Sequence, residues 1–233
     1  METGPDTSGT ELLTGGALTA LIRRPEPLVD GKSPPVLVML HGFGANESDI
    51  YELVPYVDNR VLVVAARGPF VAQDNPRGSY KWYDWSAPGQ ILPELWNKSL
   101  ELLATFVGQI GELTGVAVNP TQIYIGGFSQ GGAMSLGMAA HSPQLLAGIL
   151  PHSAFAHADS APKLRAGAFQ GKPAFVAHGT EDQVLKIEMG RQVRDILQEG
   201  GVEVSYREYP IAHTTSVASR QDLADWLDKK LNL

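Results

Sequence analysis

Apolar residues along the chain fall into two patterns, short continuous runs and stripes with helical spacing. Continuous runs over 36–40 and 61–66 are typical of strands buried on both faces of a parallel sheet. Apolar or alternating patterns predict further strands over 17–23, 122–126, 145–150, 173–177 and 202–209.

Helical stripes separate these runs. From Trp96 or Asn97 to Leu113, apolar residues recur on one face, among them Leu103 and Ile110. Other helices are expected over 49–57, 130–141, 184–198 and 216–231; in the last, Leu223, Trp226 and Leu227 are expected to face inward. Strands that alternate with helices predict an α/β fold with a mostly parallel, doubly wound sheet flanked by helices.

The remaining segments set the expected domain organisation. Residues 1–16 are expected to form a flexible N-terminal segment, and 17–233 a single domain. Proline and glycine punctuate residues 67–96, which predicts a long loop region. The stretch 151–172 is too short for an independent lid domain, so only loops are expected around the site.

Charge and composition exclude several classes of function. Lys and Arg number 18 against 25 Asp and Glu, a net charge of −7, which argues against nucleic acid as a partner. The chain has no cysteine, which excludes disulfides and a thiolate nucleophile. No signal peptide or long apolar span is visible, so we expect a cytoplasmic protein without stable membrane insertion. The sequence leaves open whether the protein forms a homodimer.

The motif most informative about chemistry is Gly127-Phe128-Ser129-Gln130-Gly131, a G-x-S-x-G sequence. It lies between a predicted strand and a helix rich in small residues, which is the setting of a nucleophile elbow. There a serine sits on a tight, strained turn at a helix N-terminus, and the glycines let neighbouring segments approach closely. The alternative is a glycine-rich helix cap.

A nucleophilic serine needs a base, and the base needs an orienting carboxylate. Asp182 follows the predicted strand 173–177, with Glu181 as the alternative carboxylate. His213 follows the last predicted strand and is the only histidine after Asp182. Because catalytic groups gather at the carboxyl ends of parallel strands, we expect Ser129, Asp182 and His213 to meet.

The oxyanion that forms during attack also needs donors. The main-chain N–H groups of Phe43 and Gln130 are the candidates, one in the loop after the strand 36–40 and one directly after the nucleophile. His41 is expected to tie the loop down rather than to act in catalysis. His152, His157 and Asp159 have no spacing typical of metal ligands, so no metal site is expected.

Four segments together resemble one known family. They are HGFGAN at 41–46, GGFSQGG at 126–132, HGTEDQVL at 178–185 and the late His213. The chain resembles, over about 17–231, the phospholipase/carboxylesterase group of α/β-hydrolases, which includes the acyl-protein thioesterases. The resemblance implies an α/β-hydrolase fold, Ser129 as nucleophile, Asp182 as orienting acid, His213 as base, and no metal or organic cofactor.

The resemblance also suggests where substrate binds. Residues 80–85 look like the aromatic stretch that these enzymes carry beside the acyl groove. We expect Trp82, Tyr83 and Trp85, together with Phe43 and Leu185, to supply the apolar walls that contact substrate. The alternative for both tryptophans is packing in the core. Family members often have proline where this chain has Gln183, and glycine where it has Ile211 or Ala212. These departures affect loop shape and leave substrate preference open.

The sequence thus predicts a serine carboxylesterase acting on a small-molecule ester of short to medium acyl chain through an acyl-enzyme. One alternative is an acyl-protein thioesterase or lysophospholipase acting on long acyl chains. A more distant alternative is a non-catalytic binding protein with the hydrolase fold.

Overall fold

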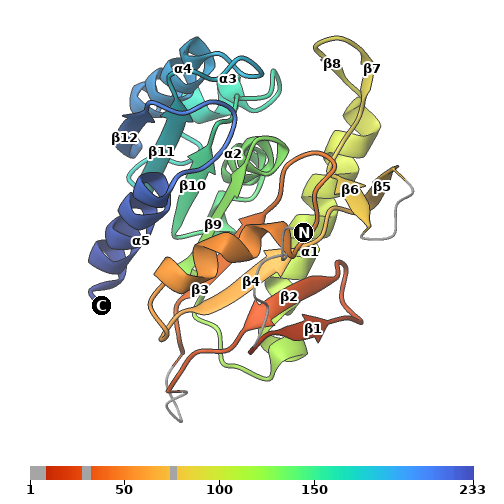
Figure 1. Cartoon of the computed structure of the whole chain (residues 1–233), viewed down its shortest axis with the longest axis vertical. Coiled ribbons are helices and arrows are strands. Elements are labelled where there is room, and N and C mark those ends of the chain that lie inside the picture. The colour runs from red at the N-terminus through yellow and green to blue at the C-terminus, as the bar shows by residue number, and fades with distance from the viewer. Residues whose placement is uncertain (1–8, 28–32, 74–77) are drawn as a thin grey trace.

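The computed structural model describes residues 9–27, 33–73 and 78–233. Eight strands form its main sheet (Figure 1): β1 (Glu11–Leu13), β2 (Ala20–Arg23), β3 (Val36–Leu40), β4 (Leu62–Ala66), β9 (Ile123–Phe128), β10 (Gly148–His152), β11 (Pro173–Gly179) and β12 (Glu203–Tyr209). The helical segments are η1 (Asp49–Tyr56), α1 (Pro93–Thr114), η2 (Pro120–Gln122), α2 (Gln130–His141), η3 (Pro143–Leu145), α3 (Ala161–Arg165), α4 (Ile187–Glu199) and α5 (Val217–Leu231). Helix η1 is of the 3-10 type.

The order of strands in the sheet is β1-β2-β4-β3-β9-β10-β11-β12. Strands β1, β2 and β4 pair antiparallel, and every other pair is parallel, which confirms the predicted mostly parallel α/β sheet. From β3, the next strand β4 is added on one side, whereas β9, β10, β11 and β12 are added in order on the other side. In such sheets a crevice opens at the carboxyl ends of the two strands where the winding reverses, here β3 and β9.

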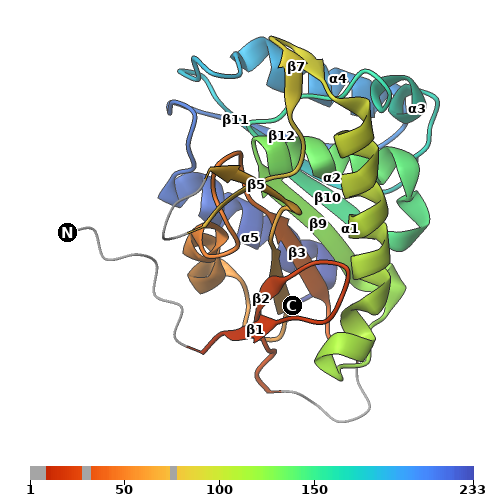
Figure 2. The same ribbon diagram turned by 90° about the vertical axis from the view of Figure 1, so that its right-hand side faces the viewer.

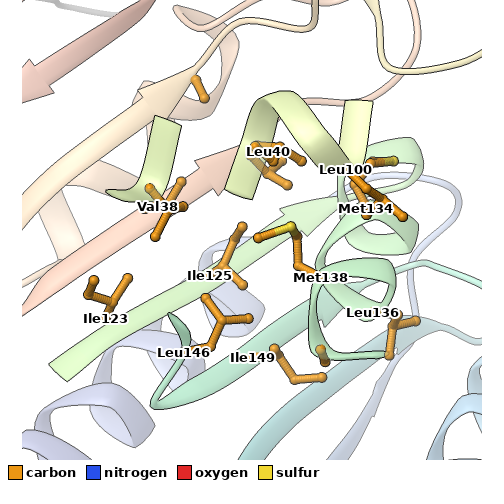
Figure 3. Packing of buried hydrophobic residues seen from close by; sticks show 14 of the residues in the cluster. Val38, Leu40, Leu100, Ile123, Ile125, Met134, Leu136, Met138, Leu146 and Ile149 are labelled. Atoms are coloured by element: carbon orange, nitrogen blue, oxygen red, sulfur yellow. The ribbon is translucent and has the colours of Figure 1, made fainter. Parts of the chain in front are cut away.

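Both faces of the sheet are covered, which explains the continuous apolar runs. On β3, Val38 and Leu40 pack in the core with α1 and α2, whereas Leu37 and Met39 pack in a second core with η1 and α5. Successive side chains of a strand point to opposite faces, so one run serves both cores. Figure 2 shows α1 and α2 on one side of the sheet and α5 on the other, and Figure 3 shows part of the first core.

Helix α1 is longer than its apolar stripe predicts. It begins at Pro93, because proline at the first helical position has its φ already set and no N–H to satisfy. It ends before Gly115, whose φ of 66° is the left-handed value that stops a helix. Its buried face includes Leu103 and Ile110, as the spacing predicts.

The prediction of a long loop over 67–96 is wrong in detail. The structure has two small hairpins there, β5 (Phe70–Gln73) with β6 (Ser79–Lys81) and β7 (Trp85–Ala87) with β8 (Gln90–Ile91). The strands are too short to show alternation in the sequence. The β7–β8 hairpin stands out from the body of the molecule (Figure 1).

The N-terminal region also differs from expectation. Residues 1–8 lie outside the described residues, but Glu11–Leu13, within the segment expected to be flexible, forms β1 at the sheet edge by pairing with β2. Only Leu13 of this strand is buried, so the strand has no alternation of apolar and polar residues that the sequence could reveal. Residues 153–172 hold loops and α3, which packs on α2 and α4, so no separate lid domain is present among the described residues. No helix in the described ranges is long and apolar enough to cross a membrane.

Candidate active site

Ser129 occupies the sharp turn between β9 and α2. Its backbone has φ of 54° and ψ of −114°, a conformation that is strained for any residue with a side chain. Its N–H donates a hydrogen bond of 3.0 Å to the carbonyl of His152 at the end of β10. The turn therefore holds the serine hydroxyl at the crevice, beside the N-terminus of α2.

The flanking glycines are required by close backbone contacts. A Cβ at Gly127 would lie 2.5 Å from the carbonyl oxygen of Leu40, and one at Gly131 would lie 2.0 Å from the same atom. Real Cβ atoms essentially never come so close to another heavy atom. The G-x-S-x-G motif thus lets the turn press against the end of β3.

Ser129, His213 and Asp182 form a continuous chain of hydrogen bonds. The Nε2 atom of His213 lies 3.0 Å from the Ser129 hydroxyl oxygen, and Nδ1 lies 2.7 Å from Oδ2 of Asp182. His213 follows β12 and Asp182 follows β11. Ser129 lies 84 positions before His213 in the sequence, and Asp182 lies 31 positions before it, so the fold brings the three together. The alternative carboxylate, Glu181, is exposed to solvent.

Asp182 lies in an environment that keeps it ionised. Burial alone would raise the pKa of this carboxyl, but the hydrogen bond with His213 and those from the main-chain N–H groups of Leu185 and Val184 outweigh it, so the pKa lies below its ordinary value. On the other side, the fully buried His178 has Nε2 at 3.6 Å from Asp182 and donates to the carbonyl of Leu185 at 2.7 Å. The carboxylate is thus fixed by His213 and two main-chain N–H groups, and His178 helps to hold the loop that provides those groups.

The two expected oxyanion donors lie beside the serine. Gly42, directly before Phe43, packs against Ser129, since a Cβ built there would be 3.5 Å from that of the serine. Among the described residues, the main-chain N–H groups of Phe43 and Gln130 donate no hydrogen bond to other groups of the chain. The Gln130 N–H also belongs to the first turn of α2, where helix dipoles favour negative charge.

His41 has a structural role in this geometry, as expected. It is fully buried, its Nδ1–H donates to the carbonyl of Gly42 at 2.7 Å, and its Nε2 accepts from the N–H of Gly68 at 2.9 Å. Burial lowers the pKa of His41 to about 4, so the ring is neutral at pH 7. Both ring nitrogens are therefore used to hold the loop that carries Phe43.

A cavity of about 520 Å³ opens beside Ser129 and His213. Of the residues expected to contact substrate, Tyr83, Trp85 and Leu185 line it, and so does Phe43. The sequence analysis missed several other lining residues, among them Leu53, His152, Phe155, Val184, Ser219, Arg220 and Leu223. Their side chains come from η1, α5, the end of β10 and loops after other strands, so no local motif marks them.

Trp82 does not line this cavity, which corrects the expectation for that residue. It is fully buried, its indole N–H donates to the carbonyl of His41 at 2.9 Å, and its main-chain N–H donates to Oε1 of Gln130 at 3.0 Å. The Gln130 amide also donates to the carbonyl of Tyr83 at 3.0 Å. These hydrogen bonds fix Trp82 in the core between the loop after β3 and the start of α2, away from the cavity.

His157 and His152, for which the sequence predicts no metal site, contact other side chains. His157 stacks on Trp96 with ring centroids 4.2 Å apart, and His152 contacts the Ser153 hydroxyl at 3.2 Å. Within the described ranges, no group of three or more His, Asp or Glu side chains converges as metal ligands would.

Known proteins are similar to this chain over most of its length. A family model described as Phospholipase/Carboxylesterase matches residues 29–231. Acyl-protein thioesterase 1 of Kluyveromyces lactis is 26% identical over 214 residues, covering 85% of this chain and 92% of that protein. Lysophospholipase-like protein 1 of Mus musculus is 24% identical, with 86% of this chain and 89% of that protein covered.

Solved structures show the same fold. A carboxylesterase from Mesorhizobium loti superposes with a TM-score of 0.79 at 20% identity, covering 94% of this chain and 99% of that one. A Bacillus cereus carboxylesterase gives a TM-score of 0.74 at 19% identity, with 96% and 95% covered. The extent of the family match, together with this fold, shows that the chain belongs to the phospholipase/carboxylesterase family of α/β-hydrolases and is a serine hydrolase that acts on ester bonds.

Proposed function

We propose that the protein is a serine carboxylesterase that hydrolyses small carboxylic esters with short to medium acyl chains. The observation that carries the proposal is the hydrogen-bonded chain from Ser129 through His213 to Asp182, with distances of 3.0 and 2.7 Å. This is the arrangement that a serine nucleophile, its general base and an orienting carboxylate require.

In the first step, His213 Nε2 takes the hydroxyl proton of Ser129 as the oxygen attacks the ester carbonyl. The N–H groups of Phe43 and Gln130 hold the resulting oxyanion, and Asp182 stabilises the imidazolium. His213 then gives the proton to the leaving alcohol, which departs and leaves the acyl group on Ser129.

In the second step, water replaces the alcohol. His213 takes a proton from the water as it attacks the acyl-enzyme, and the carboxylic acid leaves when Ser129 recovers the proton. No metal or cofactor is needed for either step, because the histidine moves every proton and the main chain holds the charge.

The proposed acyl preference rests on the walls near the β7–β8 hairpin. Trp85 and Tyr83 pack edge to face at 5.4 Å, and Phe43 lies 5.7 Å from Trp85. These rings offer apolar surface but are backed by Trp96, whose ring lies 5.2 Å from Tyr83. An aromatic wall close to the serine suits a short or medium chain better than a long one.

A second candidate function is hydrolysis of long-chain thioesters or lysophospholipids. It is favoured by the names of relatives, which include acyl-protein thioesterase 1 of Saccharomyces cerevisiae at 27% identity over 84% of this chain. The two functions differ in the length of acyl chain that the cavity has to accept.

The test is hydrolysis of p-nitrophenyl esters from acetate to palmitate by the full chain, with Ser129→Ala as the blank. The proposal predicts a maximum of kcat/KM between acetate and octanoate. A maximum at palmitate would support the second candidate. Absence of Ser129-dependent turnover at every length would contradict both and leave a binding protein with the hydrolase fold.

A further inference from the structure

The cavity beside Ser129 reaches both faces of the sheet. We call its lining residues Phe43, Trp85, Phe155 and Val184, which lie on β7 and on the loops after β3, β10 and β11, the outer arm. We call its lining residues on η1, on β10 and on or just before α5 the inner arm; they are Leu53, Leu150, His152, Thr215, Arg220 and Leu223. Tyr83 at the outer arm belongs to the core shared with α1, whereas Leu53, Leu150 and Leu223 belong to the core shared with α5. The single cavity beside Ser129 is therefore lined by residues from both cores.

The position of the general acid decides which region takes the leaving group. In acyl transfer, the leaving oxygen receives its proton from His213 Nε2, so the leaving group has to lie beside that ring. The two residues directly after His213, Thr214 and Thr215, line the cavity, and Arg220 donates to the Thr215 hydroxyl at 2.9 Å. The inner arm thus includes Thr215, two residues after the general acid, and Arg220, which is hydrogen-bonded to it.

The two arms also differ in polarity. Phe43, Trp85 and Val184 of the outer arm are exposed apolar side chains. The inner arm has an apolar floor but carries hydrogen-bonding groups, including two buried atoms without a partner among the described residues, Nε2 of His152 and Nε of Arg220. Buried donors and acceptors without partners are costly, so a ligand hydroxyl that reaches either atom as its side chain turns toward the cavity gains affinity.

The charges of the inner arm narrow the class of ligand. The Arg220 guanidinium is paired with Glu52 at 2.8 Å, so its charge is balanced within the arm. Asp49, which also lines the cavity, adds a negative charge. His152 is neutral at pH 7, because burial lowers its pKa to about 3. An anionic group would meet net negative charge here, whereas a neutral hydroxylated group can accept from Arg220 and exchange a hydrogen bond with His152.

We propose that the inner arm is the leaving-group site and that Arg220 and His152 make it selective for a neutral, hydroxylated alcohol such as a polyol. This inference rests on the proposed function and specifies its substrate class. Arg220 is a specificity-determining residue in this account, since it contacts the alcohol and not the reacting atoms.

The same site receives the alcohol when the reaction runs in reverse, which gives a direct test. An acceptor alcohol attacks the acyl-enzyme, its proton passes to His213, a bond forms between the acyl carbon and the acceptor oxygen, and the bond to Ser129 breaks as the serine recovers the proton. The product ratio between acceptors then reports their binding in the inner arm. It is measured only on molecules that form acyl-enzyme, so misfolded protein does not affect it.

The experiment supplies p-nitrophenyl butyrate as acyl donor and either glycerol or 1-propanol as acceptor, and measures glyceryl butyrate, propyl butyrate and butyrate by chromatography. Both acceptors have a three-carbon chain, with two primary hydroxyls in glycerol and one in 1-propanol, so transfer is counted per mole of primary hydroxyl. On that basis we expect transfer to glycerol to exceed transfer to 1-propanol by about tenfold, the effect of one hydrogen bond to a charged donor.

The Arg220→Met and His152→Leu variants should bring this ratio towards one. Gln221→Met is the matched control, because Gln221 is the exposed neighbour of Arg220 on α5 and donates only to Asp225. It should keep the wild-type ratio. A wild-type ratio of one or less, or an unchanged ratio in Arg220→Met, overturns this inference. The proposed esterase function still stands in that case, provided that Ser129-dependent release of nitrophenol is observed. Absence of Ser129-dependent nitrophenol release overturns the proposed function, and the inference with it.

Discussion

Lowering the pH should destabilise the protein through a buried histidine at the end of β10. His152 is 5% exposed, and burial, followed by the neighbouring His178 and His213, lowers its pKa to about 3. Its ordinary value is 6.5. Between these two values the unfolded chain binds a proton at this residue and the folded protein does not. The stability that the neutral ring provides is therefore complete above pH 6.5 and is lost as the pH falls towards 3.

The size of the effect follows from the two pKa values. Over the two pH units from 6.5 down to 4.5, His152 of the unfolded chain becomes protonated in nearly every molecule, whereas in the folded protein it stays almost entirely neutral. Each pH unit is then worth about 1.4 kcal/mol, so His152 alone lowers the free energy of unfolding by about 3 kcal/mol between pH 7 and pH 4.5. That is a large share of the 5–15 kcal/mol typical of a domain.

Urea unfolding followed by tryptophan fluorescence at both pH values measures this effect. In His152→Leu, which keeps the volume of the side chain, the loss of stability between pH 7 and pH 4.5 should be smaller than in wild type by about 3 kcal/mol. The comparison is made within each variant, so a change in packing cancels. His141→Gln is the control, because His141 is only half-buried and should alter the pH dependence less. Equal pH dependence in wild type and His152→Leu would refute the reasoning.

Three further predictions concern the turn, the triad and the outer arm. Gly131→Ala should destabilise the protein by about 3 kcal/mol or more in thermal or urea unfolding, since its Cβ would lie 2.0 Å from the Leu40 carbonyl; Gly108→Ala, with nothing within 4 Å, should stabilise α1 slightly. Asp182→Asn should lower kcat for p-nitrophenyl butyrate by about 10⁴-fold, and a loss under tenfold would contradict its role. Trp85→Ala should raise KM for the hexanoate ester more than for the acetate ester in the same assay, and equal changes would place the acyl chain elsewhere.

Much of the fold was predictable because its cues are local. The run Val36–Leu40 is apolar throughout because cores cover both faces of the sheet, and its bounds agree with β3. The candidate triad was found because each member follows a strand, and parallel strands end at one edge. The glycines beside Ser129 had a recognisable steric cause.

The features that could not be predicted from the sequence depend on contacts between segments that are distant in the chain. Trp82 and Trp85 have similar surroundings in the sequence, but Trp82 is fixed in the core by His41 and Gln130. The inner arm combines side chains of η1, β10 and α5, which meet only in the folded protein. His152 carries no motif, and its burial follows from the place of β10 between β9 and β11.

The central claim is that Ser129 is a nucleophile activated by His213. The most direct measurement is reaction of the full chain with a fluorophosphonate probe, followed by mass spectrometry of the labelled peptides. The account predicts one probe per chain, attached to Ser129, with no label in Ser129→Ala and labelling slowed by orders of magnitude in His213→Ala. A label on another residue, or equal labelling rates with and without the imidazole, would contradict it.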